Sequence, residues 1–178
     1  MFNTKVIVKT KSVLNNQAIS VTLKLVGFVI MATAIPAVLH VQWVTGPLVN
    51  AVLFLSVIYC GLSGALIVGM VPSTIALSAG LLPVAIAPAI PFIILGNAVM
   101  VSIFSLLKKK SFWTGVVGGS VLKAAFLFLT VPIIAGLVAK PVIVQKIVLM
   151  FSWPQLVTAL AGGVIAVVVV KIVQRLTV

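Results

Sequence analysis

Long apolar stretches, interrupted only by short polar and basic segments, run through almost the whole chain. Of its 178 residues, 63% are hydrophobic and 7% are charged. Soluble domains carry roughly 25% charged residues, so this chain has too few charges to cover itself in water. Since one helical crossing of a bilayer uses about 20 apolar residues, the pattern predicts an all-α, multi-pass membrane protein.

Six spans are predicted after a basic cytoplasmic tail of residues 1–17, so that residues 18–178 form a single six-helix transmembrane domain. The connections include a polar–aromatic loop at His40–Gly46, a tight turn at Gly61, and a loop from Lys140 to Lys146. A Pro- and Ala-rich stretch at Gly80–Pro91 is expected to be irregular. The predicted spans are about Ala18–Leu39, Pro47–Cys60, Leu62–Ala79, Ala87–Leu107, Phe112–Ala139 and Ile147–Val170.

Basic residues fall between alternate spans, and this asymmetry predicts the orientation. Cytoplasmic segments of membrane proteins carry an excess of Lys and Arg. With the N-terminus inside, only Lys140 and Lys146 lie outside, and both termini are cytoplasmic in a multi-pass protein of the plasma membrane. The nine residues on the inner side are Lys5, Lys9, Lys11, Lys24, Lys108, Lys109, Lys110, Lys171 and Arg175. A cleaved signal peptide is an alternative interpretation of the first span.

The residue types present exclude several classes of function. The chain has twelve Lys and Arg, one His, one Cys, and no Asp or Glu. The basic residues lie between hydrophobic spans, so nucleic acid is not a predicted partner. Zinc and calcium sites need several His, Cys or carboxylate ligands, so neither a metal nor another cofactor is predicted. No nucleophile–base pair or nucleotide-binding loop is present, so we do not expect an enzyme.

Lys123 is the most informative single residue, because it lies inside a predicted span. It is 11 positions beyond Phe112, roughly 16 Å along a helix that rises 1.5 Å per residue. Intramembrane ionisable residues usually have a functional role and a nearby partner, and this chain has no carboxylate to offer. We expect Lys123 to contact an anionic or carbonyl-bearing substrate. The alternative is a lysine that is neutral or solvated by water in a polar cavity.

A set of uncharged polar and aromatic residues is predicted to lie in the outer half of the bundle. Ligand pockets combine a few placed polar groups with apolar and aromatic walls, and such a set could supply one. Each member also has a structural interpretation, as an interfacial aromatic residue or as a polar group that bonds a neighbouring helix. With Lys123, the candidate substrate-binding residues are His40, Trp43, Asn50, Ser73, Asn97, Trp153 and Gln155.

Several segments resemble the substrate-binding S components of energy-coupling factor (ECF) transporters. They read ATAIPAVLH, GPLVNAVLFL, GMVPSTIALSAGLLP, IPFIILGNAVMV and SWPQLVTALAGG, and the resemblance covers about residues 20–170. It implies a six-helix bundle that captures a vitamin or vitamin precursor from outside. It also implies two kinds of protein partner, a transmembrane coupling subunit and two ATPase subunits. One departure concerns docking, since Ala32, Ala34 and Ala37 lack the spacing of four that the family often shows on its first helix.

Two other classes of function remain open. In the first, the chain is a non-catalytic structural or assembly subunit of a larger membrane complex, with Lys123 against a carboxylate of a partner. In the second, it is a small pore. A pore should show a polar stripe along the full depth of one helix, whereas the polar residues here concentrate on one side.

Overall fold

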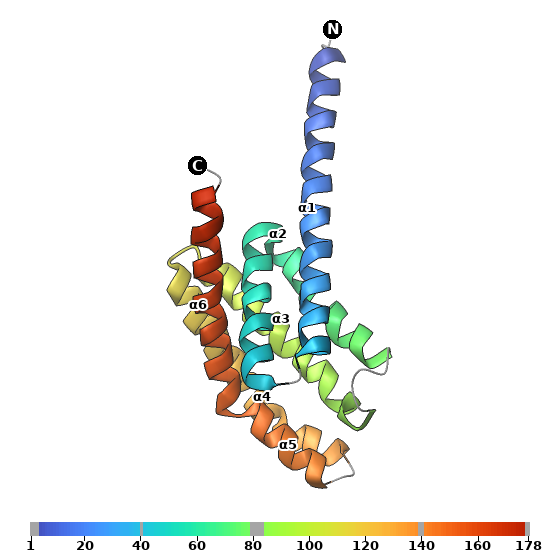
Figure 1. The fold of residues 1–178 in the computed structure, drawn as a ribbon, viewed down its shortest axis with the longest axis vertical. Coiled ribbons are helices and arrows are strands. Elements are labelled where there is room, and N and C mark those ends of the chain that lie inside the picture. Colours follow the sequence, from blue (N-terminus) through green and yellow to red (C-terminus); the bar gives the residue numbers. More distant parts are fainter. Residues whose placement is uncertain (1–3, 40, 79–83, 139–140, 177–178) are drawn as a thin grey trace.

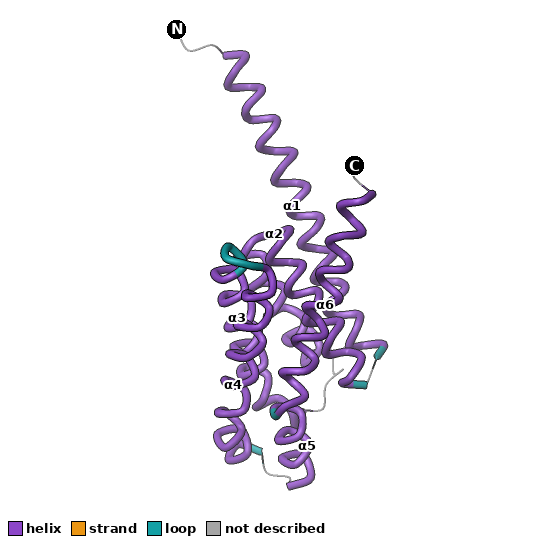
Figure 2. Tube along the Cα trace, turned by 90° about the vertical axis from the view of Figure 1, so that its left-hand side faces the viewer, coloured by secondary structure: helices purple, strands orange, loops and turns teal. Residues whose placement is uncertain are grey.

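A computed structural model describes residues 4–39, 41–78, 84–138 and 141–176, and its elements in those ranges are all helical (Figures 1 and 2). For residues 4–16, 76 and 84–86 the description covers the backbone alone. The all-α prediction is therefore confirmed for the described residues. The elements are α1 (Thr4–Val38), α2 (Gln42–Ser78), the 3-10 helix η1 (Val84–Ala89), α3 (Ile90–Leu107), α4 (Phe112–Leu137), α5 (Pro141–Phe151) and α6 (Trp153–Leu176).

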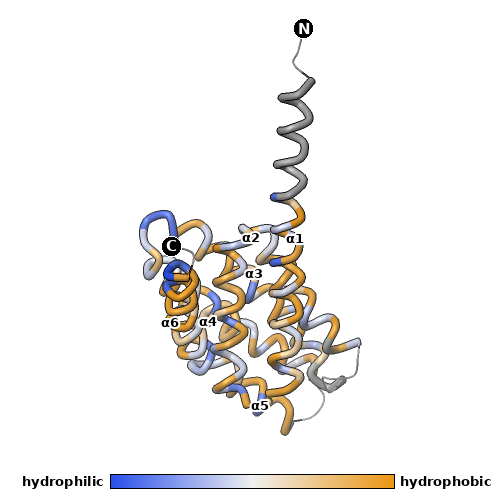
Figure 3. The backbone as a smooth tube through the Cα atoms, turned by 45° about the horizontal axis from the view of Figure 1, so that its top comes forward, coloured by the Kyte–Doolittle hydropathy of each residue, from blue (hydrophilic) through white to orange (hydrophobic). Residues whose placement is uncertain are grey.

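Five of the helices are long and apolar enough to cross a membrane. The five apolar segments are Gln17–Val38, Gln42–Ile75, Ala87–Leu107, Phe112–Leu137 and Trp153–Leu176. Large apolar side chains on α1, α4 and α6 are exposed, and Figure 3 shows apolar residues along all of these helices. Exposed apolar surface on this scale is unfavourable in water, so the chain has the character of a multi-pass membrane protein.

The longest element, α2, is two helices joined at Gly61. The backbone there has φ 74° and ψ −178°, a conformation that is essentially confined to glycine and costs other residues about 1–3 kcal/mol. A Cβ built on Gly69 would lie 3.6 Å from the side chain of Leu53. These residues are each eight positions from Gly61, so they would be about 24 Å apart in one straight helix. The two halves of α2 therefore fold back on each other as a hairpin (Figure 1), and the predicted turn is confirmed.

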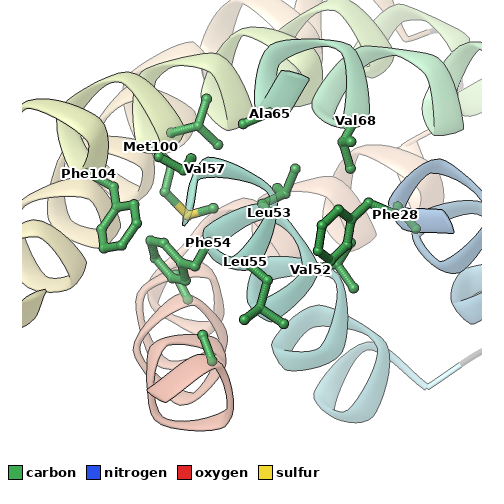
Figure 4. Close-up of a cluster of buried hydrophobic side chains, with 14 of the residues drawn as sticks. Phe28, Val52, Leu53, Phe54, Leu55, Val57, Ala65, Val68, Met100 and Phe104 are labelled. Atoms are coloured by element: carbon green, nitrogen blue, oxygen red, sulfur yellow. The ribbon is translucent and has the colours of Figure 1, made fainter. Parts of the chain in front are cut away.

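The first half of α2 is the centre of the bundle. Eight consecutive residues, 50–57, are buried, which is the pattern of a helix covered on every side. Its Phe54 packs edge-on against Phe104 of α3, with ring centroids 4.8 Å apart (Figure 4). By contrast, α1 is peripheral, because only 11% of its apolar span is buried. It reaches the core through Phe28 and Ala32.

Glycines allow α4 and α6 to approach their neighbours closely. A Cβ on Gly119 would lie 2.8 Å from the Met100 carbonyl oxygen of α3, and one on Gly162 would lie 2.9 Å from the Pro47 carbonyl oxygen of α2. At these two glycines the helices thus approach the backbone of their neighbours closely, as small residues permit in membrane bundles. This close packing fixes the depth at which the middle residues of α2, α3, α4 and α6 meet.

The predicted boundaries of the last span are wrong. Residues 141–151 form the separate helix α5 instead of a loop, and α6 begins at Trp153 rather than Ile147. The cause is Pro154. Its backbone nitrogen has no hydrogen to donate to the Met150 carbonyl, and its ring would clash with that carbonyl in a continuous helix. That carbonyl instead accepts hydrogen bonds from Gln42 Nε2 at 3.2 Å and Gln155 Nε2 at 3.0 Å.

The first connection is shorter than predicted. The loop expected at His40–Gly46 ends by Gln42, because α2 begins five residues before Pro47. The Val41 carbonyl already accepts the backbone N–H groups of Val44 and Thr45, so the first turn forms before the proline. The irregular stretch expected at Gly80–Pro91 lies partly outside the described residues, and its described part includes η1.

Candidate functional site

The amine of Lys123 is held by two asparagines at the centre of the bundle. Lys123 is only 5% exposed. Its Nζ donates to Asn50 Oδ1 at 2.7 Å and to Asn97 Oδ1 at 2.9 Å. Three residues that are far apart in the sequence, on α4, α2 and α3, therefore form one polar centre, which we call the Lys123 centre.

A fourth segment joins the Lys123 centre through Asn97. The Nδ2 of Asn97 donates to the carbonyl of Gly69, in the second half of α2, at 3.3 Å. Asn50, Asn97 and Lys123 lie 8, 7 and 11 residues from the start of their helices, which is roughly 10–17 Å along each axis. All three are therefore deep within apolar helices, far from either end of the bundle.

The Lys123 centre provides hydrogen-bond acceptors for the amine but no negative charge to balance it. As an ammonium, the lysine has three N–H donors, and the asparagines accept two of them. Amide oxygens are neutral, and the chain contains no Asp or Glu. A buried charge without a counter-charge is costly, so an anionic or strongly polar group would be attracted to this point.

Ser120 is a further polar residue beside the centre, and the sequence analysis missed it. It is fully buried, and its hydroxyl has no hydrogen-bond partner among the described residues. It precedes Lys123 by three positions on α4, and residues at this spacing share a helix face. The spacing of three residues from Lys123 was the feature of the sequence that could have identified Ser120. The side chain could complete a binding site for a group that accepts or donates a hydrogen bond.

Three other predicted site residues gather where α2 begins and α6 begins. The rings of Trp43 and Trp153 are 5.2 Å apart, centroid to centroid, and they are 50% and 64% exposed. Gln155 bonds the Met150 carbonyl together with Gln42. Exposed tryptophans at helix ends favour the interfacial interpretation of this pair.

An apolar layer lies on the α5 side of the Lys123 centre. Leu127 and Ile134 follow Lys123 along α4 and pack with Ile147 and Phe151 of α5 and with Ala89 of η1. Leu127 is one turn from Lys123 and faces Gly96 of α3. In this structure the centre is thus closed on the side of α5, and a solute arriving from there must displace these side chains.

The two remaining predicted residues are not part of either group. Ser73 is half-buried in α2, one turn beyond Gly69, and within the described residues it does not bond Lys123. His40 lies outside the described residues. A group of three His, Cys, Asp or Glu side chains that could hold a metal is not found in the part of the chain that the structure describes.

Comparison with known proteins gives no significant match to a protein family, to a curated protein or to a solved structure. The interpretation of the site therefore depends on its own geometry and chemistry.

Proposed function

We propose that this chain is the substrate-binding S component of an ECF-type importer and that it captures a small anionic or carbonyl-bearing solute, such as a vitamin or a vitamin precursor, at the Lys123 centre. It hydrolyses nothing itself. The observation that carries the proposal is the lysine amine held between two neutral amide oxygens, in a chain that has no acidic residue to neutralise it.

A carboxylate or carbonyl oxygen of the solute would supply what the bundle lacks. An ionised acceptor makes a shorter and stronger hydrogen bond to an ammonium than a neutral amide does, and the low dielectric of the interior strengthens the attraction. Ser120, one turn away, offers a hydroxyl to the same group. Asn50 and Asn97 position the amine, so the lysine is already ordered before the solute arrives.

The solute would arrive from the side of α5 and the tryptophan pair. Asn50 is eight residues from Gln42, at the start of α2, so the Lys123 centre lies roughly 12 Å along the helix from that end. α5 is short, and it is separated from α6 by the break at Ser152. A movement of α5 would carry Ile147 and Phe151 away from Leu127 and open the apolar layer.

Six crossings with both termini inside make this side the outside of the cell. The turn at Gly61 divides α2 into two crossings, of 19 and 17 residues. Both termini lie at the end of the molecule that also carries the α3–α4 turn with Lys108–Lys110 (Figure 1). Positive charge concentrates on cytoplasmic segments, and this supports our proposal of a plasma-membrane protein with α5 outside.

The resemblance to S components supports the proposed partners, a transmembrane coupling subunit with two ATPase subunits. The peripheral helix α1 is the natural docking surface, since it packs mainly on α2 and its span is 11% buried. Ala32 points into the core, so it is not available for docking. Ala34 and Ala37 are exposed and, with Gly27, give this helix a smooth outer face.

A structural or assembly subunit is the second candidate, and one observation favours it. Asn50, Asn97, Lys123 and the Gly69 carbonyl connect four segments, as a purely structural polar network would. The form of this candidate that sets Lys123 against a partner's carboxylate has no support, because the lysine is buried inside its own bundle.

Mass spectrometry of small molecules that co-purify with the detergent-solubilised protein tests the proposal. We expect the wild type and Lys146→Gln, a control that removes an exposed charge on α5, to retain one solute at close to one molecule per chain. Lys123→Met should lose it. No enriched solute in the wild type, or equal retention by Lys123→Met, contradicts solute capture. An S component should retain its solute without any partner, so the ECF assignment is tested by a separate pull-down. Failure of that pull-down to recover coupling and ATPase subunits contradicts the ECF assignment alone.

A further inference from the structure

Exposed basic residues gather at the end of the bundle formed by the α3–α4 turn and the end of α6. Figure 3 shows this turn as a strongly hydrophilic loop beside the C-terminus. Lys109, Lys110, Lys171 and Arg175 are exposed there. We call these four residues, together with Trp113, the basic end surface.

Contacts between α4 and α6 bring the two parts of this surface to one level. A Cβ on Gly163 of α6 would meet Val116 of α4. Lys110 precedes Val116 by six residues, and Lys171 follows Gly163 by eight, which is roughly 9 Å and 12 Å along the two helices. The α6 C-terminus and the start of α4 lie toward the same end of the molecule (Figure 1), so these lysines lie at about the same level along the bundle.

The three consecutive lysines of the turn do different things. Lys108 folds back over the bundle, where its Nζ donates to the Val57 carbonyl at 3.1 Å and lies 6.0 Å from the centre of the Phe104 ring. Burial lowers the pKa of Lys108. Val57 is one of the last four residues before Gly61, whose carbonyls lack partners within the helix. Lys108 therefore caps the first half of α2, while Lys109 and Lys110 face outward.

No acidic side chain of the chain can neutralise these outward charges, because it has no Asp or Glu. The same helices also expose apolar side chains further along from the charges, namely Val117 of α4 and Val164 and Val168 of α6, and Trp113 is 48% exposed. A basic level above an apolar level, with a tryptophan between them, matches an amphipathic partner with an anionic head and a hydrocarbon tail.

We propose that the basic end surface binds an anionic phospholipid, with the phosphate headgroup on Lys109, Lys110, Lys171 and Arg175 and the acyl chains along the exposed apolar faces of α4 and α6. A lipid fits better than an acidic protein because the apolar surface continues directly from the charged one. This site is at the opposite end from the tryptophan pair and does not depend on the proposed function.

Lipid retention in native mass spectrometry tests this proposal. The protein is reconstituted into nanodiscs of equal parts phosphatidylcholine and phosphatidylglycerol, and the lipids that remain bound after release are counted. The wild type should retain phosphatidylglycerol preferentially. Since each basic residue near an anionic surface contributes about fivefold in affinity, Lys109→Gln/Lys110→Gln should reduce the preference by roughly 25-fold.

Two controls separate a built site from net charge and from folding. Lys146→Gln removes an exposed charge at the other end and should leave the preference unchanged. Lys108→Gln removes the cap on Val57 and should lower the melting temperature without changing the preference. Equal retention of both lipids by the wild type, or an unchanged preference in Lys109→Gln/Lys110→Gln, overturns the proposal. If that double variant instead loses a co-purifying acidic protein with lipid preference intact, the surface binds protein and the lipid proposal fails.

Discussion

Replacing Lys123 by methionine tests why a lysine is kept at the centre of the bundle. Methionine has an unbranched, apolar side chain that adapts to irregular spaces, so the change removes the amine and keeps most of the volume. It leaves two amide oxygens, of Asn50 and Asn97, without the donor that they bond at 2.7 and 2.9 Å.

The gains and losses in this variant nearly cancel. Leaving a buried acceptor unpaired costs about 1–3 kcal/mol, although polar contacts between membrane helices average only about 0.6 kcal/mol. Removing the buried amine recovers about 2.5–3.5 kcal/mol of insertion cost. For two oxygens, the change in unfolding free energy therefore lies between about −3.5 and +2.3 kcal/mol, where a negative value means a less stable fold.

Asn50→Leu should behave differently. Leucine has the branched shape of asparagine, so packing is kept, but the amine stays buried and loses its shorter hydrogen bond. Hydrogen bonds to charged groups contribute about 1.5–3 kcal/mol, and nothing offsets this loss. We expect Asn50→Leu to destabilise the fold by more than Lys123→Met does. The double variant should be close to Lys123→Met, because the second change removes a partner that is already gone.

Equilibrium unfolding in detergent micelles, followed by far-ultraviolet circular dichroism, measures these four proteins. The reasoning predicts the order wild type, Lys123→Met, then Asn50→Leu in falling stability, or the first two reversed. If Lys123→Met is less stable than Asn50→Leu by more than about 1 kcal/mol, which exceeds the usual error of such comparisons, the main role of the lysine is to stabilise the fold. The structural-subunit candidate would then be the better account.

Three further predictions concern the fold. Gly119→Ala places a Cβ 2.8 Å from a backbone carbonyl of α3 and should cost about 1–3 kcal/mol in the unfolding assay, whereas Gly136→Ala on the same helix meets nothing within 4 Å and should cost nothing. Gly61→Ala should lower stability by about 1–3 kcal/mol because φ 74° with ψ −178° is essentially confined to glycine; an unchanged midpoint would contradict the hairpin. Trp43→Ala and Trp153→Ala should be non-additive by about 0.5–1.5 kcal/mol in a double-mutant cycle, since the rings touch; additive effects would mean that the contact contributes nothing.

The helices that could be predicted are those whose signal is local. The lengths of the apolar runs give α3 and α4 almost to the residue, and Gly61 marks the turn inside α2. The break between α5 and α6 was missed although Pro154, which causes it, is a local signal. What the sequence does not show is that Gln42, 108 residues away, bonds the Met150 carbonyl that Pro154 leaves without a helical donor.

The candidate site divides in the same way. The depth of Lys123 follows from its position in an apolar run, so its burial could be expected. Its partners could not be, because Asn50 and Asn97 meet it only through the packing of α2, α3 and α4. Ser120 was overlooked although it shares a face with Lys123. The tryptophans, predicted in the same group, instead form an exposed pair where α2 and α6 begin.

The central claim, that an anionic solute can reach Lys123, is tested most directly by thiol labelling at Ser120. Ser120→Cys is a small change at a fully buried position, and a Cys60→Ala background removes the other thiol of the chain. We predict that an anionic methanethiosulfonate modifies this cysteine in cells, faster than a cationic one of similar size, and that Lys123→Met abolishes the difference. A cysteine that neither reagent reaches, or one that both modify at equal rates whether or not Lys123 is present, would contradict the account.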